Sequence, residues 1–230
     1  MLPRILKFAQ SHGLAATAGH IFSRVRQSLV PPVRQVFSAR LADFALTSEF
    51  KDHRVRVQAF HSPGAMPAAV LEGLLSQGTI DDRRPHSRET VTAFMNWLFS
   101  RGAEFWACYE DSSLVGYLWS LRGSRELPRC HFFPLGAQDA VFLAHEIFPA
   151  YRGRELNRKM THLVLGEMKA RGIERVYVDV LLTNKRSLKS FSKTLFVPVG
   201  QARMKMFKNR QVVIWRHRGK AAPAGPDQKG

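Results

Sequence analysis

Three arginines, Arg152, Arg154 and Arg158, lie around Gly153 in the stretch IFPAYRGRELNRKM. From Leu156 onward apolar residues recur at helical spacing, so a helix begins inside this stretch. The start of a helix presents unpaired N–H groups and the positive end of the helix dipole, and phosphate binds well there. The glycine relaxes the turn before the helix, and the arginines add positive charge. The stretch therefore predicts a site for a diphosphate group.

Two titratable residues directly precede this stretch and are candidates for a general base. Glu146 is the first choice and His145 the second, because both lie just before the end of a predicted strand, where a substrate would arrive. Neighbouring strand residues face opposite sides, so at most one of the two points into a given cleft. Asp139 and His131 are further candidates. We find no Ser/His/Asp, Walker or paired-carboxylate pattern that indicates another chemistry.

The composition is that of an ordinary globular protein, with 45% hydrophobic and 23% charged residues among 230. We find no run of eighteen apolar residues and no secretory h-region, so we expect a soluble cytoplasmic protein, with peripheral membrane contact left open. The two cysteines, Cys108 and Cys130, have no metal-ligand spacing. We therefore expect reduced, buried thiols and neither a metal site nor a disulfide framework.

The net charge of +17 comes from 35 Lys and Arg against 18 Asp and Glu, and it attracts polyanions. Nucleic acid, anionic lipid, an acidic substrate and the phosphates of a cofactor are all compatible with it. The signals of specific nucleic-acid binding, such as interleaved aromatic residues, are missing from the sequence. Nucleic acid therefore ranks below lipid as a partner.

The chain divides into a basic, partly helical extension (1–48), a domain (49–216) and a flexible tail (217–230). No acid precedes Asp43, and the apolar residues between Leu14 and Leu29 recur at helical spacing. Three interpretations of this segment stay open: a helix docked on the domain, an interfacial helix contacting anionic membrane through residues 1–42, and an organellar transit peptide.

Within the domain, the periodicities predict an α/β layered fold with a mixed, mostly antiparallel sheet of six to seven strands and helices on both faces. One parallel crossover lies at the centre of this sheet. The predicted strands are 53–60, 104–110, 114–121, 128–133, 139–148, 176–182, 197–207 and 211–217. The predicted helices are 66–75, 87–101, one from Leu156 to Gly172, and a short one opened by Asn184.

The strand-to-helix junction resembles that of the Gcn5-related N-acetyltransferase (GNAT) superfamily. The letters P-x-Y-R-G at residues 149–153 fit its usual wording, whereas Glu155 and Asn157 stand where the family has Gly and then Gly or Ala. The later block TNKRSLKSFSKTLFVPVG resembles the second conserved block of the family, with Asn184 and Ser187 in its pattern. The hairpin WACYEDSSLVGYL is similar to the second and third strands of the family.

The resemblance implies an acyl-CoA-dependent acyltransferase that uses acetyl-CoA or another acyl-CoA and needs no metal. The acceptor is an amine or a hydroxyl, bound by the region 62–90, and it attacks the thioester directly. The residues implied in cofactor binding are Ile147, Phe148, Arg152, Gly153, Arg154, Glu155, Leu156, Asn157, Asn184 and Ser187.

Phe191 stands where the family often has a tyrosine that acts as the general acid, and a phenyl ring cannot donate a proton. We expect Phe191 to be a core residue. Nearby basic residues form a solvated face or meet the 3′-phosphate of CoA: Lys185, Arg186, Lys189 and Lys193. These departures leave a second hypothesis, a catalytically weakened binding module on the same fold that attaches to anionic membrane or another polyanion.

Overall fold

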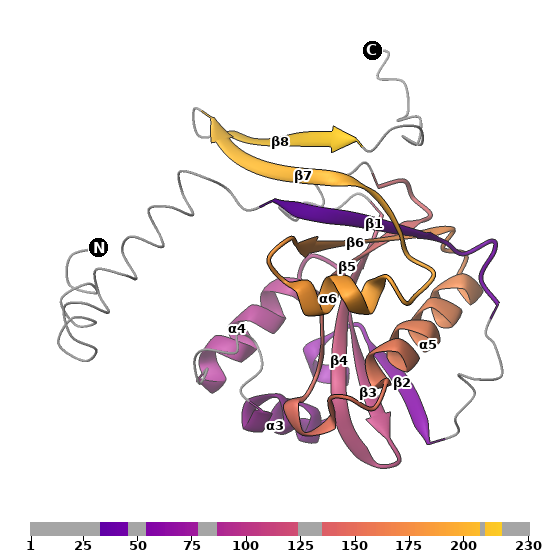
Figure 1. The fold of residues 1–230 in the computed structure, drawn as a ribbon. Helices are drawn as coiled ribbons and strands as arrows, with labels where there is room; N and C mark the ends of the chain where they lie inside the picture. Colours follow the sequence, from indigo (N-terminus) through magenta and orange to yellow (C-terminus); the bar gives the residue numbers. More distant parts are fainter. Residues whose placement is uncertain (1–32, 46–53, 78–86, 124–134, 208–209, 218–230) are drawn as a thin grey trace, which may run out of the picture.

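The computed structural model describes residues 33–45, 54–77, 87–123, 135–207 and 210–217. Within these ranges one sheet contains eight strands in the order β2-β3-β4-β5-β6-β1-β7-β8 (Figure 1). The strands are β1 (Arg34–Arg40), β2 (Val55–Phe60), β3 (Ala103–Glu110), β4 (Ser113–Arg122), β5 (Asp139–Ile147), β6 (Arg175–Leu181), β7 (Val197–Phe207) and β8 (Arg210–His217). The helices are η2 (Pro63–Ala65), α3 (Ala68–Gln77), α4 (Arg88–Phe99), η4 (Pro149–Tyr151), α5 (Leu156–Ala170) and α6 (Lys185–Phe191).

The predicted fold class is confirmed, including the parallel crossover at the centre of the sheet. β5 and β6 pair in parallel and α5 connects them, whereas the other strand pairs of the described chain are antiparallel. The β5–β6 pairing ends at Phe142 and Val178. Both strands continue, to Ile147 and Leu181, without pairing with each other. The two strands therefore diverge at their carboxyl ends.

The structure corrects the predicted boundary at residue 48, because β1 belongs to the sheet. This strand pairs antiparallel with β6 on one side and with β7 on the other. Val36 and Ala39 are almost fully buried, as expected for a strand covered on both faces. The sheet therefore has one strand more than the six to seven predicted. The helix predicted between residues 14 and 29 and the strand predicted at 128–133 lie outside the described residues.

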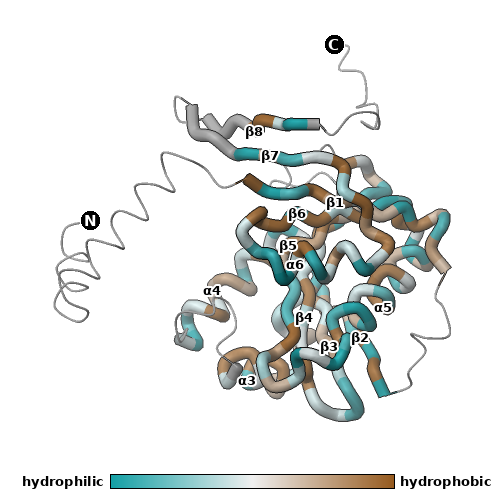
Figure 2. Tube along the Cα trace, in the orientation of Figure 1, coloured by the Kyte–Doolittle hydropathy of each residue, from teal (hydrophilic) through white to brown (hydrophobic). Residues whose placement is uncertain are grey.

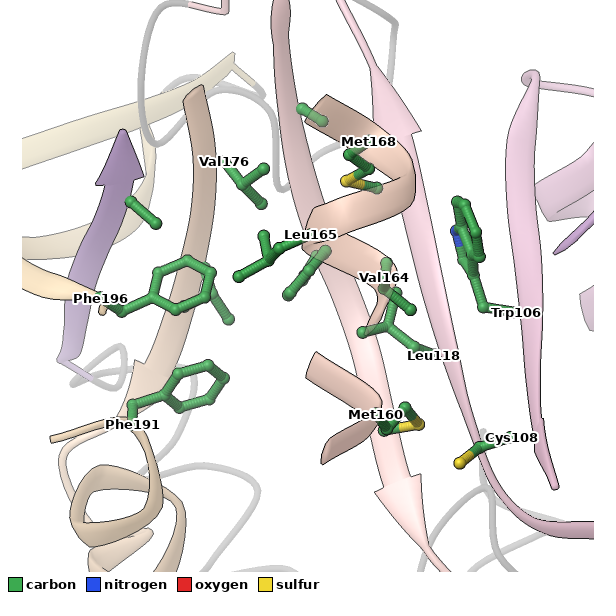
Figure 3. Close-up of a cluster of buried hydrophobic side chains, with 14 of the residues drawn as sticks. Trp106, Cys108, Leu118, Met160, Val164, Leu165, Met168, Val176, Phe191 and Phe196 are labelled. Atoms are coloured by element: carbon green, nitrogen blue, oxygen red, sulfur yellow. The ribbon is translucent and has the colours of Figure 1, made fainter. Parts of the chain in front are cut away.

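Helices cover both faces of the sheet and create two hydrophobic clusters. α3 and α4 pack on one face, through residues such as Val70 and Met95. α5 and α6 pack on the other face, where Met160, Val164 and Phe191 meet the strands (Figure 3). Cys108 is buried in the second cluster, and its burial raises the pKa of the thiol to about 12. Across the described ranges, the helices are too short or too polar to span a membrane.

Candidate functional site

A β-bulge in β5 decides which way the two candidate bases point. Trp119 of β4 lies opposite Ala144 and Ser120 opposite Phe142, so Leu143 is the extra residue. The bulge shifts the alternation of side chains that follows it. His145 then packs on Phe191 of α6, with ring centroids 5.1 Å apart. The next residue, Glu146, lies on the opposite face, which α3 and α4 cover.

Glu146 is held by two partners on its side of the sheet. Its Oε1 accepts a hydrogen bond from Arg152 Nη2 at 2.7 Å, and its Oε2 accepts one from the Tyr117 hydroxyl at 3.4 Å. The side chain keeps 20% of its surface exposed. The arrangement gives a fixed, partly exposed carboxylate on the same face as α3, which belongs to the predicted acceptor region 62–90.

His145 is in a different environment from its neighbour. Burial lowers the pKa of its imidazole from 6.5 to about 4. The ring is therefore neutral at pH 7, but with a pKa of about 4 it takes a proton from an ammonium group poorly. Its edge-on contact with Phe191 is a packing contact. Asp139, a further candidate, accepts a hydrogen bond from the Gly136 N–H in a turn at the other end of β5, and His131 lies outside the described residues.

The backbone at the end of β5 faces the gap between the diverging strands. The Phe148 N–H donates to the Val115 carbonyl of β4 at 2.9 Å, so this predicted cofactor-binding group is already engaged. Backbone groups of successive strand residues face opposite neighbours, and Ile147 therefore faces β6. The Ile147 carbonyl accepts a hydrogen bond from Arg152 Nε at 2.9 Å. The N–H of Ile147 is the group that this geometry directs into the gap.

The start of α5 lies directly after this gap and has no side-chain cap from the described part of the chain. Gly153 and Glu155 have positive φ angles of 86° and 56°. The Glu155 carbonyl accepts from the N–H groups of Arg158 and Lys159. The N–H groups just before them belong to Leu156 and Asn157, within the first turn, and are those that an α-helix leaves without intrahelical acceptors. This end of α5 is therefore compatible with an anion.

The three arginines around the start of α5 differ from the prediction, because each forms an ion pair with a carboxylate. Carboxylates of the same chain therefore partly neutralise their positive charge. The side chain of Glu155 is 63% exposed and pairs with Arg158, one helical turn away, at 3.8 Å. The three pairs are Arg152–Glu146 at 2.7 Å, Arg154–Glu110 at 2.7 Å and Arg158–Glu155 at 3.8 Å.

α6 is fixed beside the start of α5 by polar contacts and by one buried ring. Asn157 Nδ2 donates to Ser190 Oγ at 2.8 Å, which joins the two helices. Asn184 caps α6 by accepting from the Ser187 N–H at 3.1 Å. Phe191 is 1% exposed and stacks on Phe37 of β1, as expected for a core residue. The predicted roles of Asn157, Asn184 and Ser187 toward pantetheine or phosphate stay predictions.

The four basic residues around α6 are exposed, and no ion pair involving them is found within the described residues. They therefore contrast with the arginines of the neighbouring loop. Over the described chain, no three His, Cys, Asp or Glu side chains gather closely enough to hold a metal ion. The four residues are Lys185, Arg186, Lys189 and Lys193.

A model of the Acetyltransferase (GNAT) family matches residues 71–195, which include the uncapped start of α5 and all of α6. Comparison with curated proteins gives no match. Among solved structures, a GCN5-related glucosamine N-acetyltransferase region of a fungal multi-domain GH3 beta-N-acetylglucosaminidase has a TM-score of 0.54 and 12% identity. That alignment covers 82% of this chain and 22% of the other.

Two further solved structures are similar in fold. An acetyltransferase of the GNAT family from Colwellia psychrerythraea has a TM-score of 0.52 and 10% identity, over 81% of this chain and 56% of its own. A GNAT-family protein from Novosphingobium aromaticivorans has a TM-score of 0.45 and 16% identity, over 75% of this chain. This chain spans 63% of the length of that protein. At these identities the likeness concerns the fold alone.

Proposed function

Because this chain belongs to the GNAT acetyltransferase family, we propose that it transfers an acyl group, most simply acetyl, from a CoA thioester to an amine or hydroxyl acceptor. The observation that carries the proposal is the uncapped start of α5 at the point where β5 and β6 diverge. A gap between strands suits an extended pantetheine arm, and exposed helix amides suit a diphosphate. Both features meet within residues 147–157.

The chain's own groups have separate tasks in this proposal. Acyl-CoA, when bound, would supply the activated acyl thioester. The Ile147 N–H donates a hydrogen bond into the gap, and the amides of Leu156 and Asn157 hold negative charge. Glu146 takes the proton of the acceptor, because it is fixed by Arg152 and lies on the face covered by α3. Phe191 stands where the family often has a tyrosine and cannot donate a proton, so in this proposal water protonates the departing thiolate, which is a tolerable leaving group.

Calorimetric titration with acetyl-CoA tests the binding half of the proposal. We expect saturable binding that falls roughly tenfold in Asn157→Asp, because the new carboxylate repels a diphosphate at the helix start. The same carboxylate favours the helix dipole, so the melting temperature should not fall. Asn157→Ser is the matched neutral control and should bind nearly as the parent does. Absence of heat with acetyl-CoA, CoA and long-chain acyl-CoA would contradict the proposal.

Thiol release in the presence of a panel of amines and alcohols tests the catalytic half. We expect Glu146→Gln to lower kcat roughly 10²-fold, the size of a typical general-base contribution, with little change in acetyl-CoA affinity. Glu110→Gln is the matched control, because it also removes a carboxylate that pairs with a loop arginine but lies on β3. Equal losses of kcat in the two variants would exclude Glu146 as the base.

A further inference from the structure

The net positive charge of this chain comes from two parts of its sequence. Residues 43–179 contain 17 Lys and Arg and 17 Asp and Glu, and are therefore neutral. Residues 1–42 contain 6 basic residues and no acid, and residues 180–226 contain 11 and no acid. The sum of these two parts equals the whole net charge of +17. Such a division is not required by the fold.

The described residues of the two acid-free parts lie next to each other, toward the β8 edge of the sheet. β1 comes from the first part, whereas α6, β7 and β8 come from the second (Figure 1). β1 pairs with β7 along residues Arg34–Ser38, and β8 follows as the outermost strand. One end of the molecule is therefore basic, while the end that contains β2 to β5 is neutral.

Two elements present this charge on the same side of the sheet. α6 packs on that side through Phe191, and hydrophilic residues recur along it (Figure 2). In β7 and β8, Ala202 and Trp215 belong to the α3/α4 side. Side chains alternate along a strand, so their neighbours Arg203 and Arg216 face the α6 side. Arg203 also lies opposite Ile214 in the pairing of the two strands.

Ile214 is the apolar member of this surface and is 41% exposed. Arg203, opposite it in β7, and Arg216, two residues along β8, lie on the same side, so Ile214 places an exposed aliphatic group beside these cations. Single-stranded nucleic acid would require exposed aromatic rings for base stacking, but Trp215 points to the opposite side and packs against the core. Lysines and arginines around an exposed aliphatic side chain instead fit anionic lipid headgroups.

From this geometry we propose that α6, β7 and β8 form a docking surface for an anionic membrane. The surface consists of Lys185, Arg186, Lys189, Lys193, Arg203, Ile214 and Arg216. The sequence before β1 supports the same partner, because residues 14–29 carry an apolar pattern without acids and precede β1 by only a few residues in the chain. The proposal does not depend on the acyltransferase activity, since acetyl-CoA binding and membrane binding are measured separately.

Flotation of the full-length chain with vesicles tests the proposal. We expect binding to phosphatidylcholine vesicles with about 30 mol% phosphatidylglycerol and loss of binding to pure phosphatidylcholine or at about 0.5 M NaCl. Replacing the four α6 cations together by glutamine should weaken vesicle binding at least roughly tenfold. The matched control replaces four exposed arginines of the neutral part by glutamine and should bind as the parent does. These are Arg54, Arg56, Arg88 and Arg122.

Ile214→Ser distinguishes a membrane from nucleic acid. We expect this variant to weaken vesicle binding several-fold while leaving any binding to a single-stranded RNA unchanged, because only a lipid surface takes up the aliphatic side chain. Equal losses in the α6 variant and the control would mean that net charge alone acts, and would overturn the docking surface. Tighter binding to RNA than to vesicles, weakened by the same α6 substitutions, would assign the surface to nucleic acid instead.

Discussion

The loop before α5 and the helix α6 are both rich in basic residues, but they use them differently. Arg152 and Arg154 of the loop, and Arg158 in the first turn of α5, each pair with a carboxylate. The cations of α6 are exposed, without an ion pair among the described residues. The first group orders the protein, because the Arg152 pair joins the loop to β5. The second group leaves its charge exposed to solvent. A cluster of cations in a sequence therefore does not by itself identify an anion site.

The largest effect is expected where α6 is anchored. Phe191→Ala should lower the free energy of unfolding by about 3–5 kcal/mol, because the ring is 1% exposed and lies among other aromatic rings. Chemical denaturation measures it. Phe94→Ala is the control, because that ring is 37% exposed on α4. If both variants lost equally little stability, the Phe191 ring would not fix α6 on the sheet. The contrast between the basic residues of the loop and those of a firmly held α6 would then not hold.

The next effect is a loss of stability in acid that depends on His145, which packs beneath α6. Its pKa is about 4 in the folded protein, below the ordinary 6.5, so the unfolded chain binds more protons between these values. Stability is therefore complete above about pH 6.5 and falls as the pH drops toward 4, by about 2 kcal/mol at pH 5. In thermal melts between pH 7 and pH 5, the parent should show this His145-dependent loss of stability and His145→Leu should not. The same slope in both proteins would contradict it.

A smaller effect concerns the loop. Arg154→Ala should weaken acetyl-CoA binding less than about tenfold, because it leaves the Glu110 carboxylate unpaired near the proposed diphosphate site. The double variant Arg154→Ala, Glu110→Ala removes both members of the ion pair. Its affinity for acetyl-CoA should therefore be within about twofold of that of the parent. Calorimetry on the four proteins of the cycle measures this. A double variant as weak as the single one would show that Arg154 contacts the ligand directly.

The smallest effect is expected at Glu155, a non-glycine residue with a φ of 56°. This left-handed conformation costs roughly 1 kcal/mol for a residue with a Cβ. Glu155→Gly should therefore stabilise the protein by about 0.5 kcal/mol, since part of the gain is offset by the freer unfolded chain. Glu155→Ala, which keeps the Cβ, should not stabilise. Thermal unfolding separates the two, and equal melting temperatures would show that the loop is unstrained.

The sequence was sufficient for the β5-α5-β6 unit, because the spacing of apolar residues changes from strand to helix near Pro149 and back after Gly172. It was insufficient for β1. The segment RQVFSAR is buried on both faces, so it lacks the alternation that marks a half-buried strand, and its basic surroundings suggested an extension. By contrast with β1, residues 152–157 were predicted to form an anion site, and the backbone there is compatible with one.

The side-chain partners of the site could not be predicted. Arg154 and Glu110 are far apart in the sequence and meet only because β3 ends beside the loop. The pairing of Arg152 with Glu146 depends on the face to which Glu146 points, and this face is set by the bulge at Leu143. Such contacts follow from tertiary register, which no local pattern of one sequence contains.

Because Leu143 is an extra residue in β5, the number of residues in this strand decides which face of the sheet each later side chain points to. Deleting one residue there would exchange the faces of the two neighbours that follow, so that the imidazole would lie under α3 and the carboxylate under α6. The arginine of the loop would then lose its anchor, and a charged group would be buried against Phe191. The position of the candidate base thus depends on the number of residues in β5 as much as on which residues they are.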